Sequence, residues 1–318
     1  MTITNGTFMP QPVQQQFTLK LLARPQPGTI HSYMAYDQWM DQNSGDILRN
    51  RRYNNLPTAP VPLGDGIIDP APVPQSSINI DTKIEWYGQY SAVTERVYLT
   101  NEDKVINGMM GTMSQSLRET EDLLVRENLA STAAFVNATN GANGDNPTEP
   151  NRTDFDECYR LLYNASAMRI TENIPGTLRF GTAPVRSAYF GMCNSNIMAD
   201  LEQVTGWLNV AQYPDGGKNA LDDEWGTVAN FRLLVSPLGK IEANASANGA
   251  NVYDIFLVGQ ESYSKVYLDE YSAQFIYTPP EIASPNLRRY CTIGWKMVMG
   301  NKVLNDSWVI NHRVTRSV

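Results

Sequence analysis

The chain has 318 residues and a formal net charge of −8, from 25 Lys and Arg against 33 Asp and Glu. This length allows about two domains with a substantial core, and no apolar run approaches the roughly 20 residues of a membrane helix. The acidic balance argues against a sequence-specific nucleic-acid binder, because neutralising phosphate requires clustered Lys and Arg.

The first 77 residues are predicted to form an extended N-terminal arm. Ten of the chain's 19 prolines lie within the first 80 residues. Each proline fixes φ, removes a backbone donor and biases the preceding residue to extended geometry. Such an arm needs other protein surface to lie on, with one short helix at most, around residues 33–40. Arg49, Arg51 and Arg52 can in principle contact phosphate, but we interpret the cluster as solvated or ion-paired.

Residues 78–99 are predicted to form a projecting two-stranded hairpin. Apolar and polar residues alternate over 78–86, residues 87–89 interrupt the run, and residues 90–99 are rich in β-branched and aromatic side chains. An isolated hairpin is marginally stable at best. Its support is therefore either the body of its own molecule or a neighbouring subunit.

Four residues of this hairpin are predicted to contact a neighbouring subunit: Trp86, Tyr87, Tyr90 and Arg96. Aromatic side chains exposed at a loop tip are enriched among binding hot spots. The alternative is that the three aromatic residues pack within their own subunit.

Residues 100–130 are predicted to form one long helix. Thr100 and Asp103 have the spacing of a capping box. Apolar residues then recur at helical spacing without an interrupting proline. At about 1.5 Å per residue the rod would be roughly 45 Å long. Its methionines are interpreted as core packing and not as cofactor ligands.

Beyond the long helix, the pattern is typical of an α/β region. The expected elements are a loop at 137–151, a helix from Thr153, a strand at 185–193, a helix at 196–204, a strand at 231–235, a loop at 243–251, a buried strand at 252–258, and two C-terminal strands at 290–298 and 307–314.

No catalytic, cofactor-binding or metal site is predicted. His31 and His312 lack zinc-site spacing, and the three scattered cysteines argue against a disulfide framework. Nucleophile, zincin and dinucleotide-binding motifs are absent from the sequence, and residues 215–219 lack the first Gly and the Ser/Thr of a phosphate-binding loop. The acids at 222–224 leave a carboxylate-based hydrolase as an alternative.

Several short motifs stand in a fixed order between residues 80 and 315. They are IEWYGQY at 84–90, VTERV at 93–97, CNSN at 193–196, EWGTV at 224–228, NFRLLVSP at 230–237, PNLRR at 285–289, GWK at 294–296 and VLN at 303–305.

In these motifs and in the order of its elements, the chain resembles the major capsid proteins of tailed double-stranded DNA bacteriophages, in the branch found in many short-tailed phages. Two positions depart from the family pattern. Cys193-Asn194 replaces a usual His-Pro, and Ser284 replaces a usual Asp before Pro285. Both departures suggest a distant member.

The resemblance implies an α+β, Hong Kong 97-like fold. It would comprise an N-terminal arm at 1–77, an E-loop at 78–99, and a peripheral domain with a long spine helix at 100–180. An axial domain at 181–280 and a C-terminal return to the peripheral domain at 281–318 would follow. The implied function is structural and not enzymatic: the chain would self-assemble as pentamers and hexamers into an icosahedral shell around double-stranded phage DNA.

The resemblance also implies partners and a location. Expected partners are other copies of the chain, scaffolding and portal proteins, decoration proteins in some systems, and packaged DNA bound only non-specifically, with no membrane and no cofactor. The location would be the virion, and the host cytoplasm during assembly. Lys83 lies in the projected loop, but nothing in the sequence singles out a partner for a covalent crosslink. We expect that removing residues 1–75 leaves a folded but assembly-defective subunit.

One alternative function stays open, an Asn-rich tail-fibre or adhesin module. Charged residues make up only 18% of the chain, and neutral polar residues replace them, which suits both stable protein packing and an extracellular adhesin. That alternative predicts strand repeats and no long uninterrupted helix.

Overall fold

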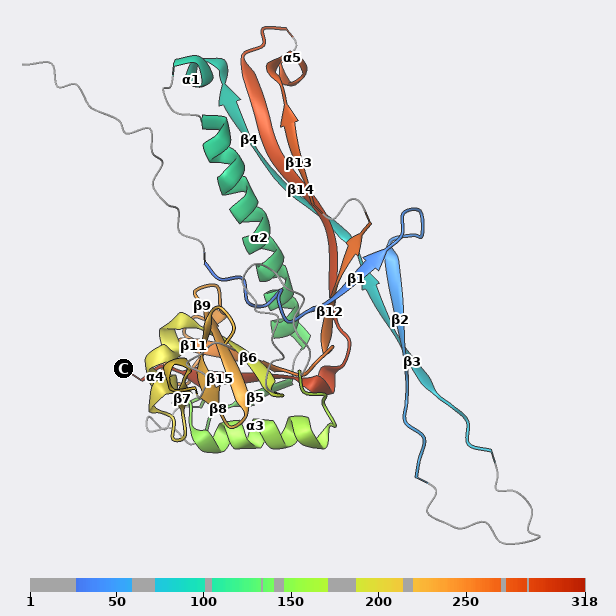
Figure 1. Cartoon of the computed structure of the whole chain (residues 1–318), viewed down its shortest axis with the longest axis vertical. Helices are drawn as coiled ribbons and strands as arrows, with labels where there is room; N and C mark the ends of the chain where they lie inside the picture. Colours follow the sequence, from blue (N-terminus) through green and yellow to red (C-terminus); the bar gives the residue numbers. More distant parts are fainter. Residues whose placement is uncertain are drawn as a thin grey trace, which may run out of the picture.

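Two β-sheets, a separate hairpin and one long helix dominate the computed structural model (Figure 1). The structure describes residues 27–58, 72–100, 105–132, 134–139, 146–170, 187–213, 220–269, 273–284 and 286–317. The long helix α2 (Val105–Thr132) runs beside one sheet and ends at the other (Figure 1).

The first sheet is built around one long strand. Its members are β1 (Tyr36–Met40), β4 (Glu85–Thr94), β12 (Tyr263–Leu268), β13 (Ala273–Thr278) and β14 (Tyr290–Val303). Strand β14 pairs with β12 and β13 along one edge and with β4 along the other. Ile293, Trp295, Met297 and Met299 alternate along β14 and are buried in the core that α2 shares.

The long helix was predicted from its apolar spacing and is present. Met113, Leu117, Val125 and Leu129 recur at intervals of four or eight residues and are buried, as expected for one face of a helix. Thr100, the predicted start, instead ends a separate short helix, α1 (Glu95–Thr100), and the described part of the long helix starts at Val105. The predicted capping residue Asp103 lies outside the described residues.

The second sheet has eight strands. They are β5 (Ala134–Asn137), β6 (Tyr189–Asn194), β7 (Leu208–Asn209), β8 (Glu224–Val228), β9 (Phe231–Ser236), β10 (Ile241–Glu242), β11 (Val252–Val258) and β15 (Val309–Thr315). Strands β6 and β9 pair in parallel, and β11 lies between β6 and β15. The predicted strands at 231–235 and 252–258 are confirmed.

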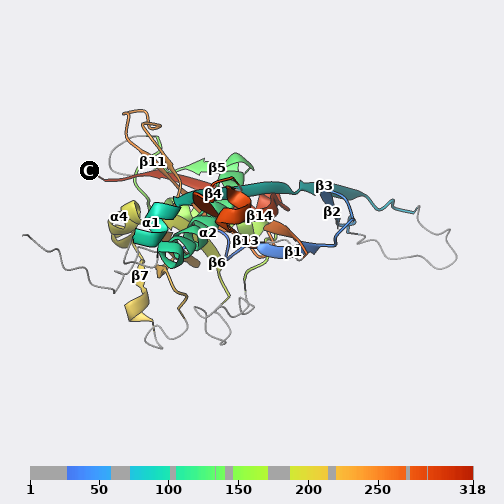
Figure 2. The same ribbon diagram turned by 90° about the horizontal axis from the view of Figure 1, so that it is seen from above.

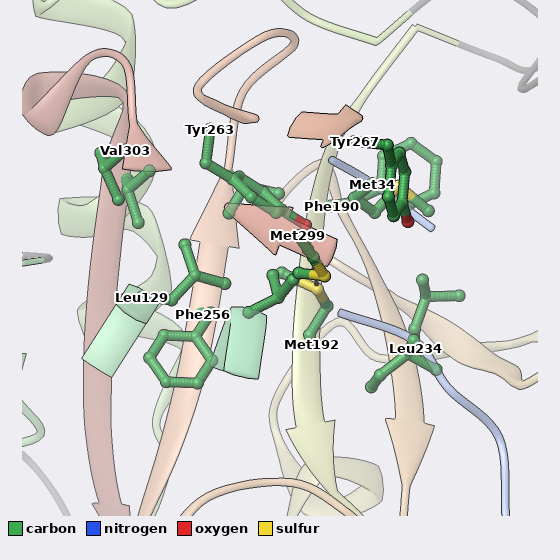
Figure 3. Close-up of a cluster of buried hydrophobic side chains, with 14 of the residues drawn as sticks. Met34, Leu129, Phe190, Met192, Leu234, Phe256, Tyr263, Tyr267, Met299 and Val303 are labelled. Carbon is green, nitrogen blue, oxygen red and sulfur yellow. Dashed lines mark hydrogen bonds between the residues drawn. The ribbon is translucent and has the colours of Figure 1, made fainter. Parts of the chain in front are cut away.

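Different layers cover the two faces of the eight-stranded sheet. Helix α3 (Arg152–Asn164) packs Phe155, Cys158 and Leu162 into a core with Tyr189 and Leu257. The helix predicted from Thr153 is therefore confirmed. Phe190 and Phe256, one residue away on the same strands, point into the opposite core with α2 and the five-stranded sheet (Figure 3). The predicted helix at 196–204 consists of a 3₁₀ turn at Ser195–Ile197 followed by α4 (Met198–Gln203).

The predicted hairpin over residues 78–99 is wrong in its pairing. Strand β3 (Ser77–Lys83) pairs with β2 (Ile47–Tyr53), and β4 pairs with β14. Residues 87–89 do not form a turn. Gly88 continues the strand, and a Cβ at this position would lie 3.0 Å from the carbonyl oxygen of Trp295. The glycine therefore marks a close approach of two strands and not a break.

Two further expectations about the N-terminal part need correction. The short helix expected around residues 33–40 is wrong: a turn at 31–34 leads into β1, which pairs in parallel with β12. The backbone donors of these residues therefore serve a sheet. Residues 27–40 also contribute Ile30, Met34 and Met40 to buried cores. Removing residues 1–75 would take these side chains away, so we no longer expect that truncation to leave the fold intact.

The C-terminal strands divide between the two sheets. Strand β14 extends five residues past its predicted end to Val303 and belongs to the five-stranded sheet. Strand β15 follows a 3₁₀ turn (Asp306–Trp308) and pairs with β11 and β5 in the eight-stranded sheet. The predicted domain boundaries stay predictions.

Candidate interaction surfaces

Strand β4 presents two of its aromatic residues to solvent. Trp86 and Tyr90 are 61% and 76% exposed, and they share one face because side chains alternate along a strand. Tyr87 points the other way, packs beside the core under α2 and donates from its hydroxyl to Glu85 at 3.3 Å. The next residue on that inner face, Gln89, accepts a hydrogen bond from Ser116 of α2 at 2.7 Å.

The outer surface around Trp86 and Tyr90 includes residues of the paired strand β14. Gly294 lies opposite Tyr90 on β14, and Lys296 lies opposite Gly88. The Lys296 ammonium sits 5.3 Å from the centre of the Trp86 ring, within the range of a cation–π contact. We call Trp86, Tyr90 and Lys296, with the intervening Gly88 and Gly294, the outer aromatic face.

Arg96 lies apart from the outer aromatic face. It is exposed on α1, beyond the end of β4 opposite to Trp86. Helices α1 and α5 (Pro280–Ala283) both lie at the end of the molecule farthest from the eight-stranded sheet (Figure 1). Apolar side chains are strongly exposed there: Val97, Leu99, Ile282 and Leu287. The sequence pattern predicted no contact role for the last two, because short polar turns surround them.

The β2–β3 hairpin is the part that projects from the body (Figure 2). Cross-strand polar pairs hold it together: Arg49 donates two hydrogen bonds to Asp81, at 2.7 and 2.8 Å, and Arg51 donates to Asn79 at 3.1 Å. The hydrogen bond from Arg49 lowers the pKa of the Asp81 carboxyl. The interpretation of the arginine cluster as ion-paired is therefore confirmed for Arg49.

Of the three acids at 222–224 that suggested a hydrolase, Glu224 is held in a structural network, whereas Asp222 and Asp223 are exposed. Glu224 accepts from Arg232 at 2.8 and 2.5 Å, and both side chains are almost fully buried. It also accepts from the Tyr213 hydroxyl at 2.8 Å and the Leu221 amide at 2.9 Å. A carboxylate that accepts four hydrogen bonds has all of its lone pairs engaged within the fold.

The other residues with reactive side chains are buried separately. His312 is fully buried, its Nδ1 lies 3.1 Å from the carbonyl oxygen of Val136, and burial lowers its pKa to about 4. Burial raises the pKa of the Cys158 and Cys193 thiols to about 12. Among the residues that the structure describes, no His, Cys, Asp and Glu side chains cluster in a group of three or more suited to a metal ion. Within the same residues, no helix is long and apolar enough to span a membrane.

The chain is similar to known proteins in its structure and not in its sequence. No protein-family model and no curated protein sequence matches the chain. Solved phage structures match it over almost its whole length. The capsid of Ralstonia phage GP4 aligns with a TM-score of 0.72 at 12% identity, covering 100% of this chain and 99% of that one.

Two further structures agree. The head of Helicobacter pylori bacteriophage KHP40 aligns with a TM-score of 0.68 at 11% identity, covering 100% of this chain and 98% of that chain. The capsid asymmetric unit of cyanophage Pam1 gives a TM-score of 0.67 at 17% identity, covering 98% and 99%. The chain therefore has the α+β, Hong Kong 97-like fold of these capsid structures.

Proposed function

We propose that this chain is the major capsid protein of a tailed bacteriophage, and that its copies assemble as pentamers and hexamers into an icosahedral shell around double-stranded DNA. The observation that carries the proposal is the extent of the structural likeness. Each of three phage capsid or head structures aligns over at least 98% of both chains. An accessory domain with another activity would leave part of the chain unmatched.

The projecting hairpin supports self-association on physical grounds. Strands β2 and β3 form a sheet of their own, separate from both large sheets, and a lone two-stranded hairpin is marginally stable in water. Tyr53 and Ile78 are exposed on it. In the proposed shell, this hairpin over residues 47–83 takes the position predicted for residues 78–99, and a neighbouring copy covers it.

We propose the outer aromatic face as a second contact between copies. Large aromatic side chains dominate the energy of protein interfaces, and Trp86 and Tyr90 lie on one open face with glycines between them. Arg96, with the exposed apolar residues of α1 and α5, would make a separate contact at the far end. Tyr87 points inward, and its role would be to fix β4 against α2.

The two alternative functions fit the structure less well. A fibre or adhesin module predicts no long helix, and α2 spans 28 residues. Of the acids that suggested a carboxylate-based hydrolase, the buried Glu224 is bound by Arg232, Tyr213 and a backbone amide. We therefore assign the chain a structural role and no catalytic one.

Further partners and the location follow from the same proposal. Scaffolding and portal proteins, and decoration proteins in some systems, would bind the shell. Packaged DNA would meet it only non-specifically, because the net charge is −8. The protein would reside in the virion, and in the host cytoplasm during assembly.

Assembly of the full-length chain tests the proposal. Sedimentation velocity and negative-stain electron microscopy are expected to show capsomers or closed shells, alone or with a co-expressed scaffolding partner. A matched variant, Tyr53→Ser with Ile78→Thr, removes the two exposed apolar side chains of the hairpin and leaves the pairing of β2 with β3 in place. It is expected to fold, judged by circular dichroism, and to fail to assemble. A full-length chain that stays a single subunit at all concentrations, with or without scaffolding, would contradict the proposal.

A further inference from the structure

One short segment crosses the junction between the two large sheets. Residues 27–35, which we call the strap, are neither helix nor strand, yet Ile30, His31, Ser32 and Met34 are buried. The strap leads directly into β1 of the five-stranded sheet. Its backbone and side chains are bound from three different elements.

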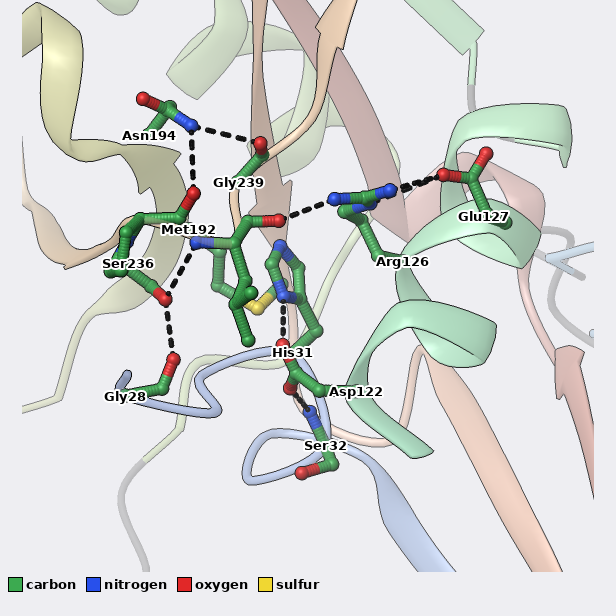
Figure 4. Close-up of polar contacts among 12 residues, drawn as sticks. Gly28, His31, Ser32, Asp122, Arg126, Glu127, Met192, Asn194, Ser236 and Gly239 are labelled. Carbon is green, nitrogen blue, oxygen red and sulfur yellow. Dashed lines mark hydrogen bonds and ion pairs between the residues drawn. The ribbon is translucent and has the colours of Figure 1, made fainter. Parts of the chain in front are cut away.

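The long helix provides the central attachment of the strap. Asp122 of α2 is fully buried and uses both carboxylate oxygens on the strap: one lies 2.7 Å from Nδ1 of His31, and the other accepts the Ser32 amide at 2.9 Å (Figure 4). One turn further along α2, Arg126 donates to the carbonyl oxygen of Leu238 at 2.5 Å. Leu238 belongs to the turn that follows β9, so α2 holds the strap and the eight-stranded sheet side by side.

Each sheet adds one attachment of its own. From the eight-stranded sheet, the Ser236 hydroxyl at the end of β9 donates to the carbonyl oxygen of Gly28 (Figure 4). From the five-stranded sheet, the Tyr263 hydroxyl at the start of β12 donates to the carbonyl oxygen of His31 at 2.6 Å. The four bonds made to the strap itself are buried, where a hydrogen bond is strongest and costly to leave unmade.

Along the chain, α2 leads from β4 of the five-stranded sheet to β5 of the eight-stranded sheet, and two short connections also join the sheets. Residues 259–262 link β11 to β12, and residues 304–308 link β14 to β15. The two connections lie side by side, because the Gly259 amide donates to the Trp308 carbonyl at 3.0 Å and the Leu304 amide donates to the Ser262 carbonyl at 2.8 Å. The two short connections are adjacent and define one axis, about which the eight-stranded sheet would turn relative to α2 and the five-stranded sheet, which is the geometry of a hinge.

The core between the sheets is also suited to rearrangement. Five methionines are buried in it: Met34, Met113, Met192, Met297 and Met299 (Figure 3). The core on the α3 side of the eight-stranded sheet contains none among the described residues. Methionine is unbranched and flexible, and it fills irregular space in more than one way. The methionines therefore concentrate where the two sheets meet.

We propose that the strap is a releasable lock that fixes the angle between the two sheets, and that its removal allows them to turn about residues 259–262 and 304–308. Bound, the strap ties β9, α2 and β12 together through Ser236, Asp122 and Tyr263. When the strap is released, the connections at 259–262 and 304–308 and the methionine-containing core remain between the two sheets. Because it joins residues 1–26 to the fold, any pull on those residues acts on this lock. The proposal does not depend on shell formation.

Distance measurement between the two sheets tests this lock. Tyr163 on α3 and Phe275 on β13 are 61% and 52% exposed, and changing each to Cys gives one spin-label site on either side of the hinge. The native cysteines are buried. Pulsed electron resonance is done on the full chain, at concentrations where sedimentation shows single subunits. The unmodified strap is expected to give one narrow distance distribution, and His31→Ala to broaden it or add a second distance.

A milder variant and a matched control keep the test decisive. Tyr263→Phe removes only the hydroxyl that binds the strap. It is expected to broaden the distribution less than His31→Ala and to speed hydrogen exchange in residues 27–35 about fivefold, the effect of one hydrogen bond. It decides the outcome alone if His31→Ala does not fold. Glu224→Gln weakens a buried ion pair within one sheet and is expected to leave the distance unchanged. An unchanged distance in the strap variants, or equal broadening in the control, overturns the lock.

Discussion

Gly294 of β14 lies directly opposite Tyr90 of β4, and the absence of a side chain at Gly294 lets the two strands and the tyrosine come together. A Cβ at Gly294 would lie 2.9 Å from both the Gln89 carbonyl oxygen and the Tyr90 Cβ. Real Cβ atoms essentially never approach so closely, so a larger residue must push the strands apart.

Gly294→Val is therefore expected to destabilise the protein, by about 1–3 kcal/mol, the usual cost of overpacking a close contact. Urea unfolding followed by circular dichroism measures this loss. Gly249 provides the matched control, since it lies in an exposed turn with open space around it. Because Gly249 has a positive φ of 76°, the fair control is Gly249→Asn, which tolerates that conformation. Equal stability of Gly294→Val and the parent chain would show that the strands are not in close contact.

The outer aromatic face makes a separable prediction about assembly. Trp86→Ala and Tyr90→Ala remove exposed side chains, so each is expected to leave the free energy of unfolding within about 0.5 kcal/mol of the parent. The Trp86 variant is expected to weaken self-association at least tenfold, because interface aromatics commonly contribute more than about 1.4 kcal/mol. Sedimentation equilibrium measures the association.

Tyr87→Ala is the control on the same strand, since its side chain packs towards α2. It is expected to lower stability by about 1–3 kcal/mol, with any effect on association following from that loss. If all three variants behave alike, β4 does not present distinct inner and outer faces.

The Glu224–Arg232 pair is almost fully buried, and Glu224 also accepts hydrogen bonds from the Tyr213 hydroxyl and the Leu221 amide. Arg232→Met leaves a buried carboxylate without its cation and is expected to cost about 3–5 kcal/mol. Glu224→Gln with Arg232→Met removes both charges and is expected to cost less than the sum of the single changes. Thermal or urea unfolding of the four proteins in the cycle gives the coupling energy, and simple additivity would mean that the pair does not interact.

The sequence predicted individual elements better than their partners. Apolar spacing predicted α2, α3 and β11, because periodicity depends on residues that are close in the chain. It did not reveal that β3 pairs with β2 and β4 with β14. An alternating pattern indicates a half-buried strand, but it does not identify the strand with which it pairs. The partner of β4 lies about two hundred residues further along the chain and leaves no local signal.

The candidate surfaces were predictable to a similar degree. The sequence predicted a contact role for Trp86, Tyr87 and Tyr90 alike, because it predicted an interruption at residues 87–89. Only the single strand at 85–94 places Trp86 and Tyr90 on one face and Tyr87 on the other. The strap was not predictable. His31 stands among prolines and polar residues, and its burial depends on Asp122, which lies 91 positions further along the chain.

Asp254 gives the sharpest test of electrostatics in the fold. It lies on β11, is almost fully buried, and burial is the main reason that its pKa rises to about 6. Lys240 and Arg126 oppose that rise without cancelling it. Because the unfolded carboxyl titrates near 3.8, the folded state binds the extra proton between about pH 4 and 6. Stability from this group is therefore present at low pH and is lost as the pH rises to 6.

Asp254→Asn removes that titration while keeping the shape of the side chain. Relative to the parent, the variant is expected to gain stability between pH 4 and pH 7, by about 2 kcal/mol. His312 titrates in an overlapping window with the opposite sign: its lowered pKa of about 4 makes the fold lose stability as the pH falls from 6.5. Subtracting the parent's unfolding free energy at each pH cancels the histidine, which both proteins share. A difference that does not change with pH would mean that Asp254 is charged in the folded protein throughout this range, and that burial does not control it.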